Sequence, residues 1–431
     1  MSETRVKIAI AGGGIAGLAL AAGLAKKPHL DVHVYESVPA YKDVGAGLAL
    51  HLNAIKAMAL IGPEVRQAYF DKALTMGDEN QEMATEVILA QGPHQGQRVA
   101  ELGRAKGRKT VSRADLLDGF LKLIPRECIS FGKKLVSIDE RQSGEHRVSL
   151  TFQDGTVATA DCLLGADGIH SVTRSYLLGP AHPAAAPKNH DGWQIYRTMV
   201  PTAEARKQIN PKWTTSVPIL LGPRGHVNCI PLNKNTRLSA GVAVRGAIFS
   251  AANSRAAPLD PALYADYSEE AQQIVRMVAK DTSASWTAAD HDHASFFARG
   301  RVAMIGDAAH ASLPFAGNGA AQALEDAAVL DHLFAHVRAE HQIGRALRAY
   351  DEVRRPRSQA VVDLARRFGR VYAYAEDGMH EDPARMKSFF GEMAAFTNAF
   401  DVEGQNGAAL RLFMEEEEDG TNGVVCNSLG C

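Results

Sequence analysis

The chain begins with a glycine-rich segment set between a short apolar run and a run of small residues. Val6–Ala11 is typical of a buried strand, and residues 15–25 predict a helix that packs closely on it. The three consecutive glycines at 12–14 separate the two elements and would break any helix drawn through them. Residues 32–35 predict a second buried strand. The chain therefore opens with a β-α-β unit, which indicates an α/β fold.

Residues 8–25 carry no charged side chain, and a run of that length also suggests a signal peptide or a membrane helix. Five glycines within the run argue against either kind of helix. The cysteines are widely spaced and form no CxxC pair, as expected in a reducing compartment: Cys128, Cys162, Cys229, Cys426 and Cys431. The protein is therefore expected to be cytoplasmic, without membrane insertion.

Four residues of the opening unit fit the binding of a dinucleotide. Gly12 allows the tight turn, Gly14 lets the backbone approach a pyrophosphate, and Gly17 lets helix and strand pack closely. The helix N-terminus supplies partial positive charge to the phosphate. Glu36 ends the second strand, where a carboxylate accepts hydrogen bonds from ribose hydroxyls. The cofactor-binding residues expected in this unit are Gly12, Gly14, Ile15, Ala16, Gly17 and Glu36.

The continuation of the chain favours FAD over NAD as that dinucleotide. An NAD-binding domain would continue with further β-α units after Glu36, whereas here Gly45 and Gly47 follow in an irregular stretch. Glycines at this point suit a backbone that lies beside a ribityl chain and a tricyclic ring.

Two later segments each show an apolar strand that ends in a turn containing glycine and aspartate. The first contains the Asp167-Gly168 pair, and the second contains Gly306-Asp307. An aspartate at such a turn can accept hydrogen bonds from ribityl or ribose hydroxyls. Pro314, Gly317 and Gly319 follow the second turn and precede a helix expected over residues 320–336.

These three motifs, in this order, resemble those of the class A flavoprotein aromatic hydroxylases, a group that includes salicylate hydroxylase and the fungal phenol hydroxylases. The resemblance covers about residues 5–370 and includes Arg113, which matches the arginine that contacts FAD in this family. It implies a Rossmann-like FAD-binding domain of the glutathione-reductase type, with an inserted β-sheet substrate domain and C-terminal helices. It also implies FAD as cofactor, NAD(P)H as transient reductant and molecular oxygen as co-substrate.

The same resemblance assigns roles to the motif residues. Asp307 would hold the ribityl–phosphate region of FAD, whereas Asp167 and Gly168 would touch both FAD and NAD(P)H. The residues implied beside the isoalloxazine are Pro314, Gly317, Gly319 and Ala320. The N-terminus of the helix that starts there can stabilise negative charge on reduced flavin.

Four residues are candidates for the substrate side, and two of them, Arg197 and His226, are the catalytic candidates. Arg197 matches an arginine that holds a phenolate in dearomatising hydroxylases, and His226 resembles a histidine of the salicylate hydroxylase pocket. Arg245 could receive a substrate carboxylate by bidentate pairing. Phe315, also expected to contact substrate, stands where salicylate hydroxylase has a histidine. Ile230 stands where the dearomatising enzymes have a tyrosine, so neither substrate pattern is complete.

The expected function is NAD(P)H- and O2-dependent hydroxylation of a phenolic aromatic compound, with salicylate-like decarboxylative hydroxylation favoured. One alternative is hydroxylation or dearomatisation of a polyketide-derived phenol, and another is a flavin oxidase or reductase that does not hydroxylate. A non-catalytic dinucleotide-binding module is a third, and it would be colourless. The choice between NADH and NADPH and between a monomer and a homodimer stays open.

Two classes of partner are excluded by composition and spacing. The formal net charge of −2 lacks the basic footprint of a nucleic-acid-binding protein. His291 and His293 offer only two imidazoles on one face of a strand, so no metal site is expected. His310, within the Gly306-Asp307 motif, is expected to be structural rather than a base.

The motifs divide the chain into interleaved parts. The FAD-binding domain is expected at 1–67, 109–178 and 296–345, and the substrate domain at 68–108 and 179–295. C-terminal helices are expected over 346–413, and the acidic, polar residues 414–431 predict a disordered tail. Helices are predicted at 52–61, 112–123 (with Ser112 as N-cap), 264–278 and 346–375. Strands are predicted at 135–139, 147–152 and 157–164, with an antiparallel or mixed sheet over 194–244 and an irregular pattern over 68–108.

Overall fold

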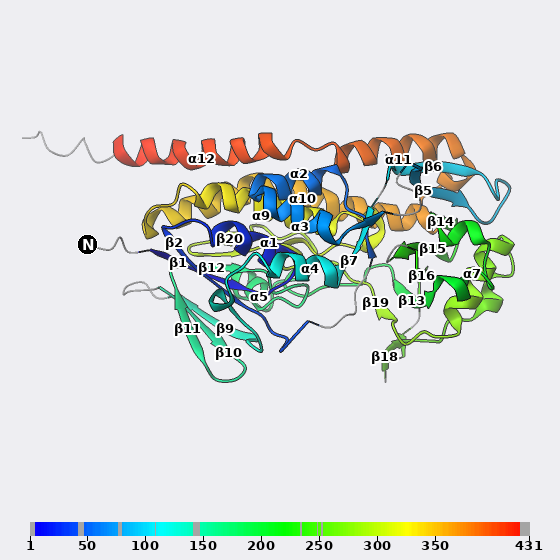
Figure 1. Ribbon diagram of the computed structural model, residues 1–431, viewed down its shortest axis with the longest axis horizontal. Helices are drawn as coiled ribbons and strands as arrows, with labels where there is room; N and C mark the ends of the chain where they lie inside the picture. Colours follow the sequence, from blue (N-terminus) through cyan, green and yellow to red (C-terminus); the bar gives the residue numbers. More distant parts are fainter. Residues whose placement is uncertain are drawn as a thin grey trace, which may run out of the picture.

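The computed structural model describes residues 5–41, 47–75, 80–107, 109–140, 147–232, 235–247, 249–250 and 253–422. Figure 1 shows the two main β-sheets towards opposite ends of an elongated molecule. Long C-terminal helices run along the molecule past both sheets, and they are α10 (Ile343–Tyr372), α11 (Pro383–Asn398) and α12 (Val402–Asn422).

The first sheet has six strands in the order β20-β21-β12-β1-β2-β8 and is parallel except for β20. Its strands come from three separated stretches of the chain: β1 (Val6–Ala11), β2 (Leu30–Tyr35), β8 (Ile129–Ser130), β12 (Cys162–Gly165), β20 (Ala298–Arg299) and β21 (Val302–Met304). The central strands β1 and β12 are buried and apolar except at Lys7, because both of their faces are covered. The β-α-β unit predicted at the start of the chain is confirmed.

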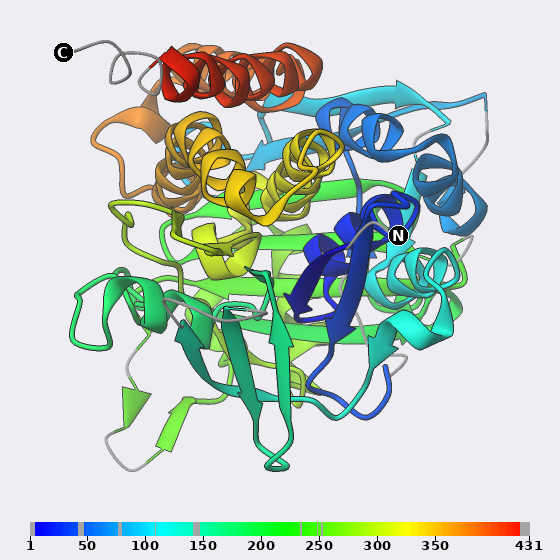
Figure 2. The same cartoon turned by 90° about the vertical axis from the view of Figure 1, so that its left-hand side faces the viewer.

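Helices cover one face of this sheet, and a small sheet lies on the other side (Figure 2). The helical side holds α1 (Ile15–Leu24), α2 (Leu52–Ile61) and α9 (Gly319–Phe334), which pack on one another. The small sheet has the order β11-β10-β9 and comprises β9 (Leu135–Glu140), β10 (Val148–Phe152) and β11 (Val157–Ala160). The remaining elements on this half are α3 (Pro63–Lys72), α4 (Arg113–Leu121), α5 (Val172–Leu178) and α8 (Asp307–His310).

The second main sheet has seven strands in the order β19-β13-β16-β15-β14-β5-β6. All neighbours are antiparallel except β14 and β5, which confirms the sheet predicted over 194–244. Its strands are β5 (Glu82–Leu89), β6 (Arg98–Lys106), β13 (Gln194–Pro201), β14 (Val217–Gly222), β15 (Gly225–Leu232), β16 (Arg237–Val244) and β19 (Trp286–Thr287). Helix α7 (Glu269–Ala279) packs on one face, whereas α10 and α11 cover the other.

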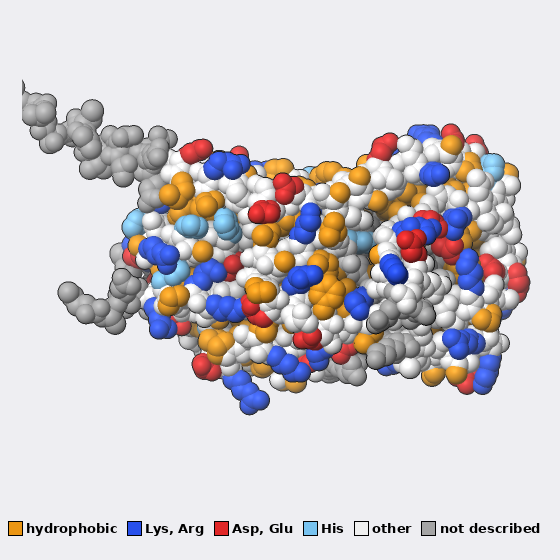
Figure 3. Space-filling model, turned by 45° about the horizontal axis from the view of Figure 1, so that its top comes forward, with side chains coloured by type: hydrophobic (Ala, Val, Ile, Leu, Met, Phe, Trp, Pro, Cys, Tyr) orange, Lys and Arg blue, Asp and Glu red, His pale blue; other side chains and the backbone are white. Residues whose placement is uncertain are grey.

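Short elements complete the described fold. A three-stranded sheet in the order β3-β7-β4 contains β3 (Gly47–Leu48), β4 (Leu74–Thr75) and β7 (Lys109–Ser112). A ribbon of β17 (Phe249–Ser250) and β18 (Asn253–Ala256) and the helix α6 (Thr202–Ala205) belong to the second half. On the face shown in Figure 3, cationic and anionic side chains are interspersed rather than gathered by sign.

Two expectations about local structure are wrong. Residues 68–108 are not irregular, because β5 and β6 form the edge of the seven-stranded sheet. The apolar alternation of β6, the edge strand of the two, is masked by polar side chains on its exposed positions. The single strand expected over 157–164 is two strands in different sheets, which separate at Asp161, whose backbone and carboxylate bond to Lys7. The helix predicted over 52–61 is confirmed, and Pro63 starts a further helix, α3, because proline is tolerated in the first helical turn.

The C-terminal tail also differs from its prediction. Helix α12 continues to Asn422, so the disorder expected from residue 414 is wrong over 414–422, while residues 423–431 lie outside the described part of the chain. Packing of α12 on α9 and α10, with Phe413 buried, supplies the tertiary contacts that the acidic composition does not reveal. A run of glutamates then extends an established helix at little cost, since glutamate is a good helix former.

Candidate active site

A cavity of about 510 Å³ lies where the carboxyl edge of the parallel sheet faces the seven-stranded sheet. We call it the main cavity. The ends of β1 and β12, the start of α8 and the loop before α9 form one side, and side chains of β5, β6, β13, β14 and β15 form the other. Most of the sequence-predicted residues line it: Gly14, Ile15, Ala16, Gly47, Arg113, Gly168, Arg197, Asp307, Pro314, Phe315, Gly317, Gly319 and Ala320.

The three motif glycines have different surroundings. Gly12 has φ +107°, and a Cβ there would collide with the carbonyl oxygen of Ala166. A Cβ on Gly17 would collide with the carbonyl oxygen of Gly12, so both positions serve close packing of strand, turn and helix. A Cβ on Gly14 would meet only Nη2 of Arg113, at 3.8 Å. Gly14 therefore opens a cradle at the N-terminus of α1 that fits a phosphate group.

Glu36 holds the glycine turn. Its Oε2 accepts a hydrogen bond from the Gly13 N–H at 2.6 Å, and its Oε1 accepts from the Val38 N–H and the Ser37 hydroxyl at 2.8 and 2.9 Å. The side chain is buried and does not line the main cavity. Gly45, the other residue expected here, lies outside the described residues. Contact of Glu36 with a ribose stays a prediction.

Asp167 likewise holds a turn rather than lining the main cavity. Its carboxylate accepts from the Thr173 N–H at 3.0 Å and from the hydroxyls of Ser171 and Thr173. Burial raises the pKa of this carboxyl, and these hydrogen bonds oppose the rise. The neighbouring Gly168 is the residue of the pair that faces the cavity.

Arg113 is the first residue of α4, where the expected cap is found. The Ser112 hydroxyl accepts from the Asp115 N–H at 3.0 Å, which confirms Ser112 as the N-cap. The cap fixes where α4 begins and so directs Arg113 into the main cavity beside Gly14.

The loop before α9 brings a helix N-terminus to the main cavity. Helix α9 has 16 residues, and Gly319 and Ala320 of its first turn line the cavity. The first N–H groups of a helix lack partners within it and carry partial positive charge. Asn318, which sequence analysis missed, precedes them, and its buried Nδ2 has no hydrogen-bond partner within the described residues. This end of the cavity therefore fits an anionic group with several acceptor atoms.

A buried charge network, also missed from the sequence, supports this loop from behind. Asp326 of α9 accepts from the Gly306 N–H at 2.8 Å, contacts His310 at 2.6 Å and pairs with Arg354 at 2.8 Å. Burial by itself would raise the pKa of Asp326, but His310 and Arg354 lower it to about 2. Arg354 also pairs with Glu325 at 2.7 Å. The contact with Asp326 agrees with a structural role for His310.

Arg197 is the cation on the opposite wall. In the sheet register it faces Gly241, which in turn faces Asn228, so the absent side chain of Gly241 leaves room between the two polar groups. The guanidinium lies over the Trp286 ring at 4.7 Å, and burial lowers its pKa. No carboxylate among the described residues pairs with it. Asn228 lines the cavity and was missed from the sequence because strand pairing alone places it there.

His226 lies two residues from Asn228 on the same sheet face but does not line the main cavity. Its ring contacts Phe315 and Tyr372 with centroids 5.3 and 4.9 Å apart, and both of these residues do line it. Burial lowers the pKa of His226 to about 3, so its imidazole is neutral near pH 7. His226 therefore lies behind the cavity wall, where it packs against Phe315 and Tyr372, and it does not face the cavity.

Arg245 is not brought to the main cavity. It forms an ion pair with Asp191, with Nη2 and Oδ1 2.8 Å apart, and a third of its side chain is exposed. Within the described part of the chain, no group of three or more His, Cys, Asp or Glu side chains is placed to hold a metal ion. Among the same residues, no helix is both long and apolar enough to span a membrane.

The chain is similar in sequence and in structure to several known proteins. Residues 5–365 match a protein family described as FAD binding domain. The chain is 36% identical over 423 residues to a 6-methylsalicylate 1-monooxygenase of Aspergillus terreus, with 96% of this chain and 93% of the relative covered. It is 35% identical over 392 residues to a salicylate hydroxylase of Pseudomonas putida, with 85% of each covered. A solved salicylate hydroxylase substrate complex matches with a TM-score of 0.79 at 28% identity, covering 95% of this chain and 98% of that chain.

Proposed function

Because the chain belongs to the FAD binding domain family, among the FAD-dependent aromatic monooxygenases of the salicylate hydroxylase type, we propose that it hydroxylates a salicylate-class phenolic acid with loss of the carboxylate. NAD(P)H is the reductant and O2 the co-substrate in this proposal. One oxygen atom enters the ring at the carbon that loses carbon dioxide, and the other leaves as water. The relatives named for salicylate and 6-methylsalicylate support this substrate class.

The observation that carries the substrate assignment is the environment of Arg197. The guanidinium is half-buried and has no carboxylate partner among the described residues. Its wall carries the polar side chains of Thr85 and Asn228 and the apolar side chains of Val217, Ile219 and Ile230. A cation held this way is costly unless an anion completes it. A salicylate carboxylate or phenolate would supply that anion and leave its ring against the apolar side chains.

The cofactor end of the main cavity fits FAD on the geometry of this chain. The cradle at Gly14 would receive the pyrophosphate, Arg113 would pair with it, and Asp307 would accept from ribityl hydroxyls. When bound, FAD supplies the oxygen activation and electron transfer that side chains cannot. The N-terminus of α9 and Asn318 would stabilise negative charge on the ring, and Phe315 and Tyr372 would help exclude water.

The proposed reaction is tested by measuring how tightly NAD(P)H oxidation is coupled to hydroxylation. With FAD-loaded protein, salicylate and 6-methylsalicylate are expected to accelerate NAD(P)H oxidation at least about tenfold, because substrate binding completes the site, and each equivalent of NAD(P)H should yield one of catechol-type product. The measurements are NAD(P)H absorbance, product by chromatography and peroxide by a coupled assay. Peroxide with no hydroxylated product would instead identify a flavin oxidase, and a lack of stimulation by any phenolic acid would overturn the proposal.

Arg197→Ala is expected to raise the KM for salicylate by roughly 10- to 100-fold while FAD content stays unchanged. A charge-assisted hydrogen bond contributes about 1.5–3 kcal/mol, which corresponds to that range. Arg245→Ala is the matched control, since it removes the same group from a site outside the main cavity. Equal kinetics in the Arg197 and Arg245 variants would show that Arg197 does not hold the substrate anion.

A further inference from the structure

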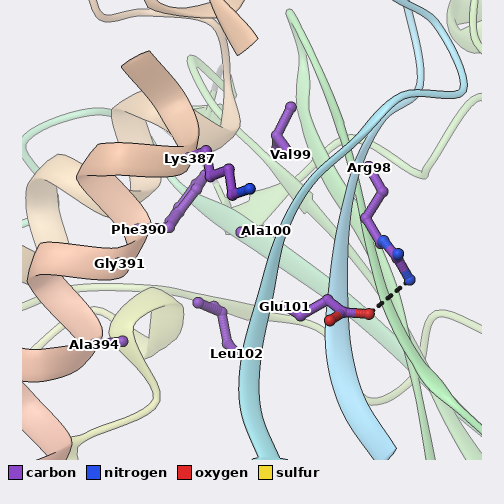
Figure 4. A pocket seen from close by; sticks show the side chains of 9 residues that line it. All are labelled: Arg98, Val99, Ala100, Glu101, Leu102, Lys387, Phe390, Gly391 and Ala394. Carbon is purple, nitrogen blue, oxygen red and sulfur yellow. Dashed lines mark ion pairs between the residues drawn. The ribbon is translucent and has the colours of Figure 1, made fainter. Parts of the chain in front are cut away.

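A second cavity lies between α11 and the edge strand β6, and we call it the α11–β6 cavity. Its volume is about 390 Å³, within the range of roughly 300–1,000 Å³ usual for small-molecule sites. Figure 4 shows its lining residues: Arg98, Val99, Ala100, Glu101, Leu102, Lys387, Phe390, Gly391 and Ala394. No motif of the sequence pointed to this place, and the proposed reaction does not use it.

Only side chains separate the two cavities. Leu102 lines both of them, and its strand partner Thr85 lines the main cavity on the same sheet face. Next to Leu102, the ring of Phe390 packs on the ring of Tyr372, with centroids 5.8 Å apart. Phe390 lines the α11–β6 cavity and Tyr372 lines the main cavity, so the partition is two rings thick there and a single side chain thick at Leu102.

The charges around the α11–β6 cavity leave one cation unpaired. Glu101 is already paired with Arg98, at 2.6 Å, and with Arg104. Lys387 is exposed on α11, reaches towards β6 in Figure 4, and has no ion pair or hydrogen bond among the described residues. Ala100 and Leu102 are half-buried and supply apolar surface beneath it, whereas the side chain of Phe390 is fully buried. A cation beside an apolar surface suits a carboxylate that is attached to an apolar ring.

The position of the cofactor makes this second cavity relevant to substrate access. The residues proposed to hold FAD occupy one end of the main cavity, so a bound cofactor closes that end. Leu102 belongs to the other end, which Arg197 and the apolar side chains of the sheet form. On the basis of the proposed function, we propose that an aromatic carboxylate binds first beside Lys387 in the α11–β6 cavity and enters the main cavity past Leu102.

An obstruction in an entrance slows binding and release equally and leaves the equilibrium unchanged. Ala394→Trp would fill the α11–β6 cavity, whereas Ala395→Trp places the same ring on the neighbouring exposed position, which does not line it. Flavin absorbance after rapid mixing of FAD-loaded protein with salicylate measures both rate constants. We expect Ala394→Trp to lower both at least about tenfold at constant Kd, and Ala395→Trp to change neither. Unaltered rates in Ala394→Trp, or a change in the dissociation rate alone, would overturn the proposal.

Charge gives an independent measurement. Lys387→Gln is expected to lower the association rate constant of salicylate about three- to tenfold at low salt, with the difference vanishing at high salt, because steering of an anion is screened. The neutral salicylamide should show no difference. Lys106→Gln, which removes an exposed cation from the far end of β6, is the control. An equal effect of both lysine variants would indicate general attraction and count against an entrance at Lys387.

Crystals of the FAD-loaded protein with 5-bromosalicylate separate failure of this proposal from failure of the proposed function. Bromine beside Lys387 in the α11–β6 cavity would support the entrance site even if no phenolic acid is hydroxylated. An α11–β6 cavity without bromine, together with unaltered rates in Ala394→Trp, would overturn it even if salicylate is hydroxylated.

Discussion

A Gly14→Val variant is expected to fold but to be purified colourless, with FAD affinity lower by at least about 100-fold, or roughly 3 kcal/mol. The backbone of Gly14 has φ −76°, which valine adopts without strain, and only Arg113 approaches the added Cβ. The valine methyls would fill the cradle at the N-terminus of α1, where the pyrophosphate is proposed to lie. Flavin absorbance per polypeptide and FAD titration by fluorescence quenching measure the loss, and circular dichroism checks the fold.

Gly17→Ala is the matched comparison, because it should destabilise the fold rather than block the binding of FAD. Its Cβ would collide with the carbonyl oxygen of Gly12 inside the strand–helix contact, so we expect a loss of about 1–3 kcal/mol in the free energy of unfolding. Full FAD content in a folded Gly14→Val protein would contradict the placement of the pyrophosphate. A Gly17→Ala protein as stable as the parent would contradict the packing role.

The parts of the fold that sequence predicted well are those decided by local chemistry. The strand at Val6–Ala11, the helix at Leu52–Ile61 and the cap at Ser112 each depend on residues within a few positions of one another. The parts it missed depend on pairing across the chain. Strand β6 was missed because an edge strand carries polar side chains on exposed positions, and its role depends on β5 lying beside it.

The same distinction applies to the candidate site. Gly14 and Asp307, which line the main cavity, were predicted to belong to the site because each lies in a glycine-containing turn that can be recognised in the sequence. Arg245 was predicted to receive a substrate carboxylate because the sequence does not reveal its partner. Asp191 lies 54 positions away, and only the fold brings the two together. Asp167 is the type of residue expected in a cofactor contact, yet its carboxylate is hydrogen-bonded to the turn that follows it. Pairing partners therefore decide whether a polar side chain remains free for a ligand.

Arg354→Met is expected to lower the free energy of unfolding by about 3–5 kcal/mol and to weaken FAD binding with it. The side chain is fully buried, and its guanidinium bonds to Glu325, Asp326, Gln322 and Gln405, which ties α9, α10 and α12 together. Removing one partner of a buried ion pair leaves uncompensated buried charge, which typically costs about 3–5 kcal/mol. Urea unfolding at fixed pH, with and without FAD, measures both effects.

The adjacent Arg355→Met is the matched control, since Arg355 pairs with Asp351 at the partly exposed side of the same helix and should cost less than about 1 kcal/mol. The pH dependence distinguishes lost charge compensation from lost packing. In the parent, the depressed pKa of Asp326 gives stability that is present above its ordinary pKa and lost as the pH falls towards about 2. Without Arg354, the effect of burial on Asp326 is opposed only by His310 and the Gly306 N–H, so the pKa of Asp326 should rise and the stability deficit of the variant should grow as the pH rises from about 3 to about 6. A deficit independent of pH over that range would show that packing, rather than charge, makes Arg354 necessary.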